Sequence, residues 1–334
     1  MIEISHLVKK YGDHIAVNDL TLTVEPGKIY GFLGPNGAGK STTMNIITGY
    51  LGATSGEVKI NGFDIFAQPE EAKKCVGYLP EIPPLYVDMT VREYLNFVAE
   101  LKKLEKGRRN KYVEEAMETT GITAQQSRLI RNLSKGYRQR VGFAQAVLGY
   151  PEIIILDEPT VGLDPKQIIE IRELIRQLAK KHTVILSSHI LAEVREVCDY
   201  ILIISKGKLV ASDTPENLER NLGDSDLIEI ETKASPDEVR RILETVDGIR
   251  SISTKYLENG ITWAQIQEKK NTDIREKVFQ AFAQNHQPLL KLNPLQVSLE
   301  DVFMELTQSD RAAEEYTEKA KKKETEDMKD AGDL

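Results

Sequence analysis

The chain has 334 residues, of which 40% are hydrophobic and 29% are charged, and its formal net charge is −8. This length suits one large domain with a smaller one, and the acidic balance argues against a nucleic-acid partner. No apolar run approaches the roughly 18–20 residues that a membrane-spanning helix needs, and Met1 to Ser5 alternate like a strand rather than a signal peptide. We therefore expect a cytoplasmic protein that reaches a membrane only through a partner.

The first 25 residues are expected to form antiparallel strands, because apolar and polar residues alternate around Ile4 and Leu22. Lys9 to Asp13 is predicted to be a turn between them, with Tyr11 at its edge. An exposed tyrosine in a turn is usually only part of the surface.

The segment that follows is rich in glycine. Gly34 to Thr42 fits the phosphate-binding pattern G-x-x-x-x-G-K-[ST], after a short apolar strand and before a predicted helix at Thr43 to Tyr50. Glycines let the backbone curve around a phosphate, and the helix dipole adds a favourable potential. We expect Lys40 to reach the β- and γ-phosphates and Ser41 to bind Mg²⁺, and Tyr11 could then stack on an adenine ring. The alternative, a glycine-rich turn in an ordinary α/β protein, is disfavoured by the strand–loop–helix context.

A short strand is predicted at Val76 to Leu79, with Glu81 just beyond its end. Ile82 to Val87 is apolar but contains prolines, so it cannot be a helix or a central strand. Such a loop suggests a partner-binding surface, with a loop folded onto its own domain as the alternative.

Asp88 to Ile130 is expected to be helical, with Thr90 as an N-cap. The residues predicted to face inward on the first helix are Val91, Tyr94, Leu95, Val98 and Leu101. The basic run Lys102 to Lys111 is predicted to be a solvated linker between helices. Ser134 and Gly136 then begin an apolar helix and suggest a second anion site, although one phosphate loop already suffices for a triphosphate.

Ile153 to Leu156 predicts a strand buried on both faces, as in a parallel sheet. Asp157 and Glu158 follow it, and two carboxylates at such a place are costly without a cation or a catalytic task. With a phosphate loop upstream, we expect Asp157 to bind Mg²⁺ and Glu158 to polarise an attacking water. Structural acidic caps are the alternative.

A helix from Lys166 to Lys180 and a second buried strand from Thr183 to Leu186 come next. The residues expected on the inner face of that helix are Ile168, Ile169, Ile171, Leu174, Ile175 and Leu178. The strand leads to His189, which would lie at the edge of the sheet where ligands bind in open α/β folds, although a lone histidine is more often structural. Cys75 and Cys198 have no metal or redox spacing and are expected to be buried thiols.

Near residue 220 the pattern changes to a small α+β domain. Strands are predicted around Leu227 and in a hairpin from Ile249 to Ile266, and helices at Pro236 to Thr245 and Ile274 to Asn285. From Gln308 onward charged residues dominate and predict a disordered or frayed helical tail.

In their order and spacing, these motifs resemble the ATP-binding subunit of ABC transporters, over Met1 to about Gly223. Tyr11 resembles the adenine-stacking aromatic, Glu81 falls at the Q-loop position, Leu133 to Gly136 resembles the signature, Gly162 to Asp164 the D-loop and His189 the switch histidine. The nucleotide contacts that the resemblance implies are Tyr11, Val17, Asn36, Gly37, Ala38, Gly39, Lys40, Ser41, Thr42, Glu81, Ser134, Gly136 and Asp164. It implies Glu158, His189 and Lys40 as catalytic residues and Ser41, Glu81 and Asp157 as Mg²⁺ ligands.

Two positions depart from the common family pattern. The signature is Ser-Lys-Gly-Tyr instead of Ser-Gly-Gly-Gln, and Glu81 replaces a glutamine and adds negative charge near the γ-phosphate. Both variants resemble those of the bacterial multidrug, antibiotic and gliding-motility export subfamily, as does Ser298 to Thr307 near the C-terminus.

The resemblance implies a P-loop α/β fold of the ABC ATPase type, with a mixed-sheet core, an antiparallel β subdomain and a helical subdomain at about residues 88–150. The expected domains are the ATPase at 1–223, the α+β domain at 224–307 and the tail at 308–334. It also implies ATP and Mg²⁺ as ligands, a head-to-tail homodimer, and a separate membrane permease that docks near Glu81 to Val87 at the inner face of the cell membrane. A soluble ABC ATPase acting on nucleic acid or ribosomes, or an ATP-gated regulatory subunit with little turnover, is the alternative function.

Overall fold

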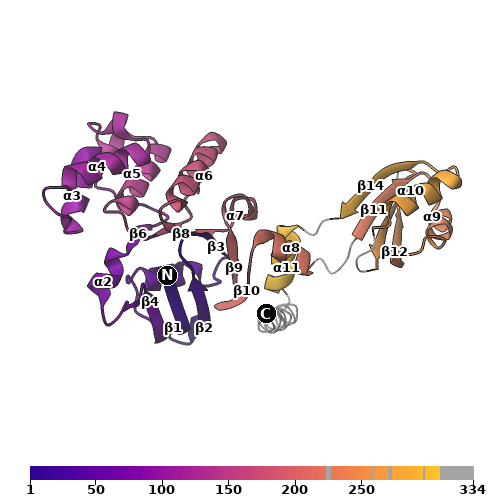
Figure 1. Cartoon of the computed structure of the whole chain (residues 1–334), viewed down its shortest axis with the longest axis horizontal. Helices are drawn as coiled ribbons and strands as arrows, with labels where there is room; N and C mark the ends of the chain where they lie inside the picture. The colour runs from indigo at the N-terminus through magenta and orange to yellow at the C-terminus, as the bar shows by residue number, and fades with distance from the viewer. Residues whose placement is uncertain (223–226, 258, 270–272, 296–297, 309–334) are drawn as a thin grey trace, which may run out of the picture. The chain divides into compact units, whose positions relative to one another are not determined.

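The computed structural model of the chain describes residues 1–222, 227–257, 259–269, 273–295 and 298–308. The chain divides into two compact units, one formed by Met1–Pro215 with the described residues from Phe303 on, and the other by Glu216–Val302. Figure 1 shows the helices and strands of both units. The tail predicted from residue 308 lies, except for residue 308 itself, outside the described residues. In the described part, no helix is long and apolar enough to cross a membrane.

The first unit combines two sheets with helices. Its strands are β1 (Ile2–Tyr11), β2 (His14–Val24), β3 (Ile29–Leu33), β4 (Ser55–Ile60), β5 (Phe63–Asp64), β6 (Val76–Leu79), β7 (Ile153–Asp157), β8 (Thr183–Ser188), β9 (Tyr200–Ser205) and β10 (Lys208–Asp213). Its helices are α1 (Lys40–Ile47), α2 (Pro69–Lys74), α3 (Val91–Leu101), α4 (Arg109–Thr119), α5 (Lys135–Val147), α6 (Pro165–Ala179) and α7 (Leu191–Val197), with 3-10 turns at Thr123–Gln125 and Ile130–Asn132. The division between the units falls within α8 (Pro215–Leu222) and α11 (Leu299–Gln308).

The central sheet has the strand order β10-β9-β3-β8-β7-β6, and all neighbours pair in parallel except β10 with β9. Every residue of β7 and β8 is buried, which confirms the prediction of buried strands there, and every residue of β3 is buried as well. Because parallel strands end at the same edge, the glycine loop after β3, Asp157 at the end of β7 and His189 after β8 arrive at one edge of the sheet.

A second, antiparallel sheet has the order β2-β1-β4-β5 and confirms the predicted pairing of the N-terminal strands, with Ile4 opposite Leu22. Its inner face packs with Phe32 of β3 and Met44 of α1 in one core. Tyr11 was expected in a turn, but it is the last residue of β1 and pairs with His14. The turn is shorter than predicted because Gly12 alone supplies the left-handed conformation that it needs (φ +58°).

The helices α3, α4 and α5 lie together beside the central sheet (Figure 1). Thr90 caps α3 in a reciprocal capping box with Glu93, as the sequence predicted for the N-cap. Leu101 was expected to face inward but is 63% exposed. The helix ends at this residue, and the inward position at its end belongs to Lys102.

The predicted solvated linker from Lys102 to Lys111 differs from the structure at both ends, because α4 already begins at Arg109 and Lys102 is not solvated. The ammonium group of Lys102 donates hydrogen bonds to the carbonyl oxygens of Gln145 and Leu148, at 3.0 and 2.8 Å, where α5 ends. Burial lowers the pKa of Lys102 to about 8. The carbonyls that a helix leaves unpaired at its C-terminus explain why a lysine is tolerated here.

Two smaller expectations also differ from the structure. Ile169 was expected on the inner face of α6 but is exposed, since it lies one position off the stripe formed by the buried Ile171, Leu174, Ile175 and Leu178. Cys198 is buried as expected, and burial raises the pKa of its thiol, whereas Cys75 is only half-buried.

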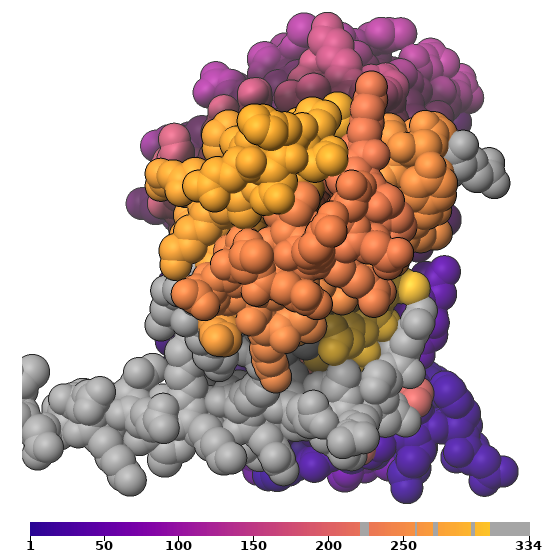
Figure 2. Space-filling model, turned by 90° about the vertical axis from the view of Figure 1, so that its right-hand side faces the viewer, coloured from indigo at the N-terminus to yellow at the C-terminus, as the bar shows by residue number. Residues whose placement is uncertain are grey.

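The second unit is a small α+β fold, as predicted. Its elements are β11 (Leu227–Thr232), α9 (Pro236–Leu243), β12 (Ile249–Tyr256), β13 (Thr262–Glu268), α10 (Arg275–Gln284) and β14 (Leu289–Leu295). The sheet order β12-β13-β11-β14, with all neighbours antiparallel, is the ferredoxin-like βαββαβ topology. Figure 2 shows one face of this unit, in orange and yellow-orange, as a continuous surface. The strand β14 was not predicted.

Gly77 tests how closely β6 and α5 pack, because a Cβ at Gly77 would lie 2.0 Å from the carbonyl oxygen of Ala146. We expect Gly77→Ala to destabilise the first unit by about 1–3 kcal/mol, since backbone must move to make room. Thermal and urea unfolding would measure the loss. Gly107→Ala is the matched control, because a Cβ there meets no atom within 4 Å. Equal stabilities of the two variants would contradict this packing.

Candidate functional site

The glycine loop between β3 and α1 is shaped as an anion cradle. Gly37 and Gly39 have φ of +80° and +103°, and a Cβ at Gly39 would lie 2.4 Å from the carbonyl oxygen of Ala16. Only glycine meets both conditions, and the backbone N–H groups at the start of α1 are thereby left to face an anion. The residues present therefore fit a phosphate chain.

Lys40, the first residue of α1, is 8% exposed. Its Nζ lies 2.6 Å from the carbonyl oxygen of Gly34 and 3.3 Å from that of Pro35, to which it donates hydrogen bonds. Burial lowers the pKa of Lys40, and the negative charges of Glu158 and Asp157 act in the opposite direction. The ammonium group is thus held in the loop next to two carboxylates.

A pocket of about 470 Å³ opens above this loop. Most of the predicted site residues line it, namely Tyr11, Asn36, Gly37, Ala38, Gly39, Lys40, Ser41, Thr42, Glu81, Glu158 and His189. The pocket is therefore assembled from the ends of β1, β3, β6, β7 and β8. His14, Ala16 and Val161 also line it, and the sequence had not singled them out.

Glu158 and His189 line this pocket and contact each other. The Oε2 atom of Glu158 lies 2.9 Å from Nδ1 of His189, and about half of the His189 side chain is exposed. A carboxylate paired with an imidazole at the mouth of an anion cradle can orient a water molecule toward a phosphate.

Asp157, the last residue of β7, precedes Glu158 in the chain and is 7% exposed. Its carboxylate accepts a hydrogen bond from the hydroxyl group of Ser187, with the two oxygens 2.5 Å apart. Sequence reasoning missed Ser187, although a polar residue at the end of an otherwise apolar strand was a usable signal.

The segment after Glu158 is anchored from two sides. The side-chain amide of Gln139, on α5, donates to the carbonyl oxygen of Pro159 at 3.0 Å. The hydroxyl group of Thr160 donates to the Glu193 carboxylate of α7 at 2.5 Å, and both residues are buried. These contacts, which the sequence did not suggest, tie the loop to the signature helix and to the helix that follows His189.

Three predicted site residues lie elsewhere in the same chain. Ser134, Gly136 and Asp164 line a second pocket of about 350 Å³. Ser134 is the N-cap of α5 and Asp164 the N-cap of α6, where they accept hydrogen bonds from the backbone N–H groups of Tyr137 and Gln167. This second pocket lies at the start of α5 and of α6, where the sequence suggested an anion site, and in the described chain it shares no lining residue with the first pocket.

Val17 was expected to contact the nucleotide, and the structure places it differently. It is 1% exposed and belongs to the hydrophobic core under the β1–β2 sheet. Its neighbour Ala16 lines the first pocket instead.

Comparison with known proteins identifies this arrangement. Residues 17–161 match the family model described as ABC transporter. The chain is 33% identical over 308 residues to the bacitracin transport ATP-binding protein BcrA of Bacillus licheniformis, covering 92% of this chain and 97% of that protein. It is 30% identical to the linearmycin resistance ATP-binding protein LnrL of Bacillus subtilis, covering 92% of this chain and 98% of that protein.

The chain belongs to the ABC transporter ATP-binding proteins. A solved ATP-binding subunit of an ABC transporter has a TM-score of 0.61 and 31% identity, with 67% of this chain and 93% of that one covered. A bacterial ABC transporter cassette solved as a dimer has a TM-score of 0.58 and 26% identity, with 64% and 98% covered. This ABC protein is accordingly a nucleotide-binding ATPase, and its first unit has the ABC ATPase fold that the sequence predicted.

Tyr11 offers a test of adenine stacking, because this residue is 49% exposed and lines the first pocket. We expect Tyr11→Ala to weaken ATP binding by about three- to tenfold and Tyr11→Phe to leave it nearly unchanged, since an aromatic stack contributes about 0.5–1.5 kcal/mol. Fluorescent-nucleotide titration would measure the affinities. Tyr50→Ala, at an 83% exposed tyrosine beyond α1, is the control. Equal affinity of Tyr11→Ala and the wild-type protein would exclude the stack.

Proposed function

We propose that the protein is the ATP-hydrolysing subunit of an ABC exporter, in which two copies close around two ATP molecules and drive a separate membrane permease. The observation that carries the proposal is the separation within one chain of a complete phosphate cradle from the signature pocket of Ser134 and Gly136. A head-to-tail dimer unites the two half-sites, and the solved bacterial cassette dimer supports this assembly.

In the proposed reaction, the loop amides and Lys40 bind the phosphates of ATP. Glu158 accepts a hydrogen bond from a water molecule and orients its oxygen in line with the γ-phosphorus. As the new P–O bond forms, the bond to the ADP oxygen breaks and the water proton passes toward the Glu158 carboxylate. His189, in contact with Glu158, steadies that carboxylate and the charge developing on the γ-phosphate.

The residues present also fit a magnesium ion. Ser41, Asp157 and Glu81 offer only oxygen atoms, which are the ligands that Mg²⁺ prefers. In the described residues, no group of three or more His, Cys, Asp or Glu side chains could hold a metal ion. Because side chains alone do not complete a metal site here, we propose that Ser41, Glu81 and Asp157 hold Mg²⁺ directly or through water together with phosphate oxygens, and the bound ion would supply positive charge at the β- and γ-phosphates.

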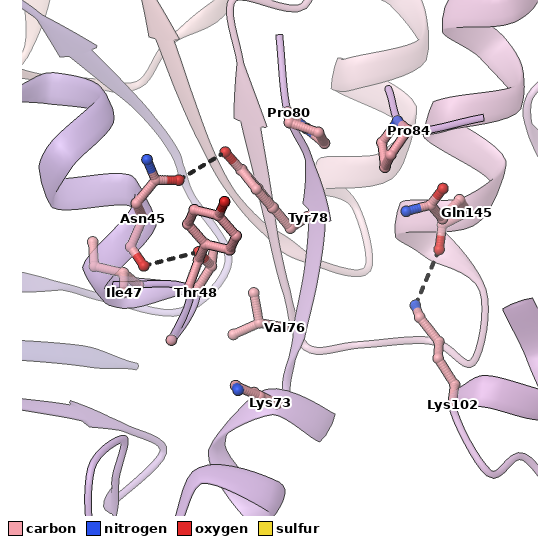
Figure 3. Close-up of a pocket in the computed structure, with 12 residues that line it drawn as sticks. Asn45, Ile47, Thr48, Lys73, Val76, Tyr78, Pro80, Pro84, Lys102 and Gln145 are labelled. Carbon is pink, nitrogen blue, oxygen red and sulfur yellow. Dashed lines mark hydrogen bonds between the residues drawn. The ribbon is translucent and has the colours of Figure 1, made fainter. Parts of the chain in front are cut away.

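The proposed permease site is the exposed apolar segment from Ile82 to Val87. Ile82 is 82% exposed, and Tyr86 packs edge-on against Phe97 with ring centroids 5.3 Å apart. A cavity of about 580 Å³ lies beside this segment. Tyr78, Pro80, Pro84, Lys102 and Gln145 lie around it in Figure 3.

An apolar surface beside a mainly apolar cavity suits a short helix of a membrane protein. Pro80 lines this cavity and the next residue, Glu81, lines the nucleotide pocket. Nucleotide-driven movement of this segment would therefore reach the permease directly. Because the relatives BcrA and LnrL are named for bacitracin transport and linearmycin resistance, we propose export of an antibiotic-like compound, with the protein at the cytoplasmic face of the membrane.

Glu158→Gln tests the catalytic role. The amide keeps the shape of the side chain but cannot take up a proton, so we expect ATP hydrolysis to fall by about a hundredfold or more while ATP binding and ATP-dependent dimerisation remain. Phosphate release and light scattering would measure the two effects. Glu57→Gln, the same change at an exposed residue of β4, should retain normal turnover. Hydrolysis at the wild-type rate by Glu158→Gln would exclude this role.

Ile82→Asp tests the docking surface. A charge at this exposed apolar residue should prevent recovery of a polytopic membrane protein from solubilised native membranes, whereas Glu158→Gln protein with ATP should retain it. Phe279→Asp, at an exposed residue of α10, is the control and should also retain it. Recovery of only soluble partners or RNA by every variant would overturn the transporter assignment.

A further inference from the structure

Ser187 occupies the middle of the functional edge of the central sheet. It lies on β8, between Phe32 of β3 and Asp157 of β7 in the strand register. One of these neighbouring strands leads into the glycine loop and the other ends in the predicted metal ligand. The side chain is fully buried, at 0% exposure, so its hydroxyl group must find all its hydrogen bonds within the protein.

The Ser187 hydroxyl group acts both as a hydrogen-bond donor and as an acceptor, with one acidic residue of the site as partner in each case. It donates its proton to Oδ1 of Asp157 and accepts the backbone N–H of Glu158, at 2.5 and 3.1 Å. In the described chain, this is the hydrogen bond that the Asp157 carboxylate makes. The Ser187 hydroxyl group therefore fixes the orientation of the carboxylate through Oδ1, and Oδ2 accepts no hydrogen bond from the described residues.

The hydrogen bond from the Glu158 N–H group to the Ser187 hydroxyl group involves a residue with an uncommon backbone conformation. Glu158 has a φ of +47°, a left-handed conformation that costs a residue with a side chain roughly 1 kcal/mol or more. Its N–H group is shared between the hydroxyl oxygen and the carbonyl oxygen of Ser187, the latter at 3.2 Å. From this backbone the Glu158 side chain reaches His189.

We propose that Ser187 is a positioning residue of the ATPase centre, which aligns the Asp157 carboxylate with the metal and holds Glu158 in the conformation that reaches His189. This inference rests on the proposed roles of Asp157 and Glu158. In this proposal β8 contributes Ser187 to the site, two residues before His189.

A serine that merely fills the core would behave differently. Alanine is smaller by one oxygen atom and fits the same place. The folding of Ser187→Ala would therefore not tell a serine that only fills the core from one that positions Asp157 and Glu158. Removal of the hydroxyl group would, however, free the buried Asp157 carboxylate to rotate and would remove one acceptor from the Glu158 N–H group. The consequences are specific to metal binding and turnover.

The experiment compares full-length wild-type protein, Ser187→Ala, Ser187→Thr and Ser188→Ala. Mn²⁺ replaces Mg²⁺ as a paramagnetic probe, and electron paramagnetic resonance measures its affinity for protein saturated with a non-hydrolysable ATP analogue. ATPase assays give kcat and KM, and metal-free nucleotide affinity and thermal unfolding are measured in parallel. Ser188→Ala is the matched control, because that neighbouring serine is equally buried but accepts the N–H group of Ile190 instead.

For Ser187→Ala we expect Mn²⁺ affinity and kcat to fall about tenfold or more, the effect of losing a hydrogen bond to a charged group, with metal-free nucleotide affinity nearly unchanged. Ser187→Thr retains the hydroxyl group and should restore most of both, and Ser188→Ala should retain the wild-type metal affinity.

Unchanged Mn²⁺ affinity and kcat in Ser187→Ala would overturn the inference. So would losses of equal size in Ser187→Ala and Ser188→Ala, which would indicate a general disturbance of the strand end. If the wild-type protein does not hydrolyse ATP, the proposed function itself fails, which is a separate outcome.

Discussion

Burial of opposite charges at one edge of the central sheet is the constraint on which the site depends. Asp157 and Lys40 are both almost fully buried. Burial lowers the pKa of Lys40, and the negative charges of Glu158 and Asp157 raise it in part. A charge at such a place persists only if partners compensate for its lost hydration. The carbonyl oxygens of the glycine loop accept hydrogen bonds from the Lys40 ammonium, and the Ser187 hydroxyl group donates to the Asp157 carboxylate. The edge is consequently preorganised for a phosphate chain and a metal ion before either is bound.

One short loop connects the nucleotide pocket above the glycine loop with the signature pocket of Ser134 and Gly136. Val161 lines the phosphate pocket, and Leu163 and Asp164 line the signature pocket. The segment from Glu158 to Asp164, which contains these residues, is tied to α5 through Pro159 and to α7 through Thr160. A shift of α5 would therefore move Pro159, and a shift of α7 would move Thr160, the two residues that follow Glu158. In the proposed dimer, movement of this loop would couple the nucleotide pocket to the signature pocket directly, without intervening contacts.

The strongest sequence signals were those in which the backbone and the chemistry agree. The glycine loop, the buried strands β7 and β8, and the Thr90 cap could all be predicted because each depends on residues close in sequence. The roles of Lys102, Ser187 and Glu193 could not, since each makes its bond to a residue 30 or more positions away. Similarly, β14 was missed because its Asn293-Pro294 resembles a turn, and only pairing with β11 makes it a strand.

The strand β6 joins the nucleotide pocket to the proposed permease site. Burial and the nearby Asp157 charge raise the pKa of Tyr78 to about 12, so its phenol stays protonated and donates to Asn45 of α1 at 3.4 Å. Tyr78 and Asn45 both line the cavity beside the permease segment (Figure 3). Three residues after Tyr78, Glu81 lines the nucleotide pocket. A change of charge in the nucleotide pocket would therefore act at the C-terminal end of β6, which leads directly into the proposed permease segment.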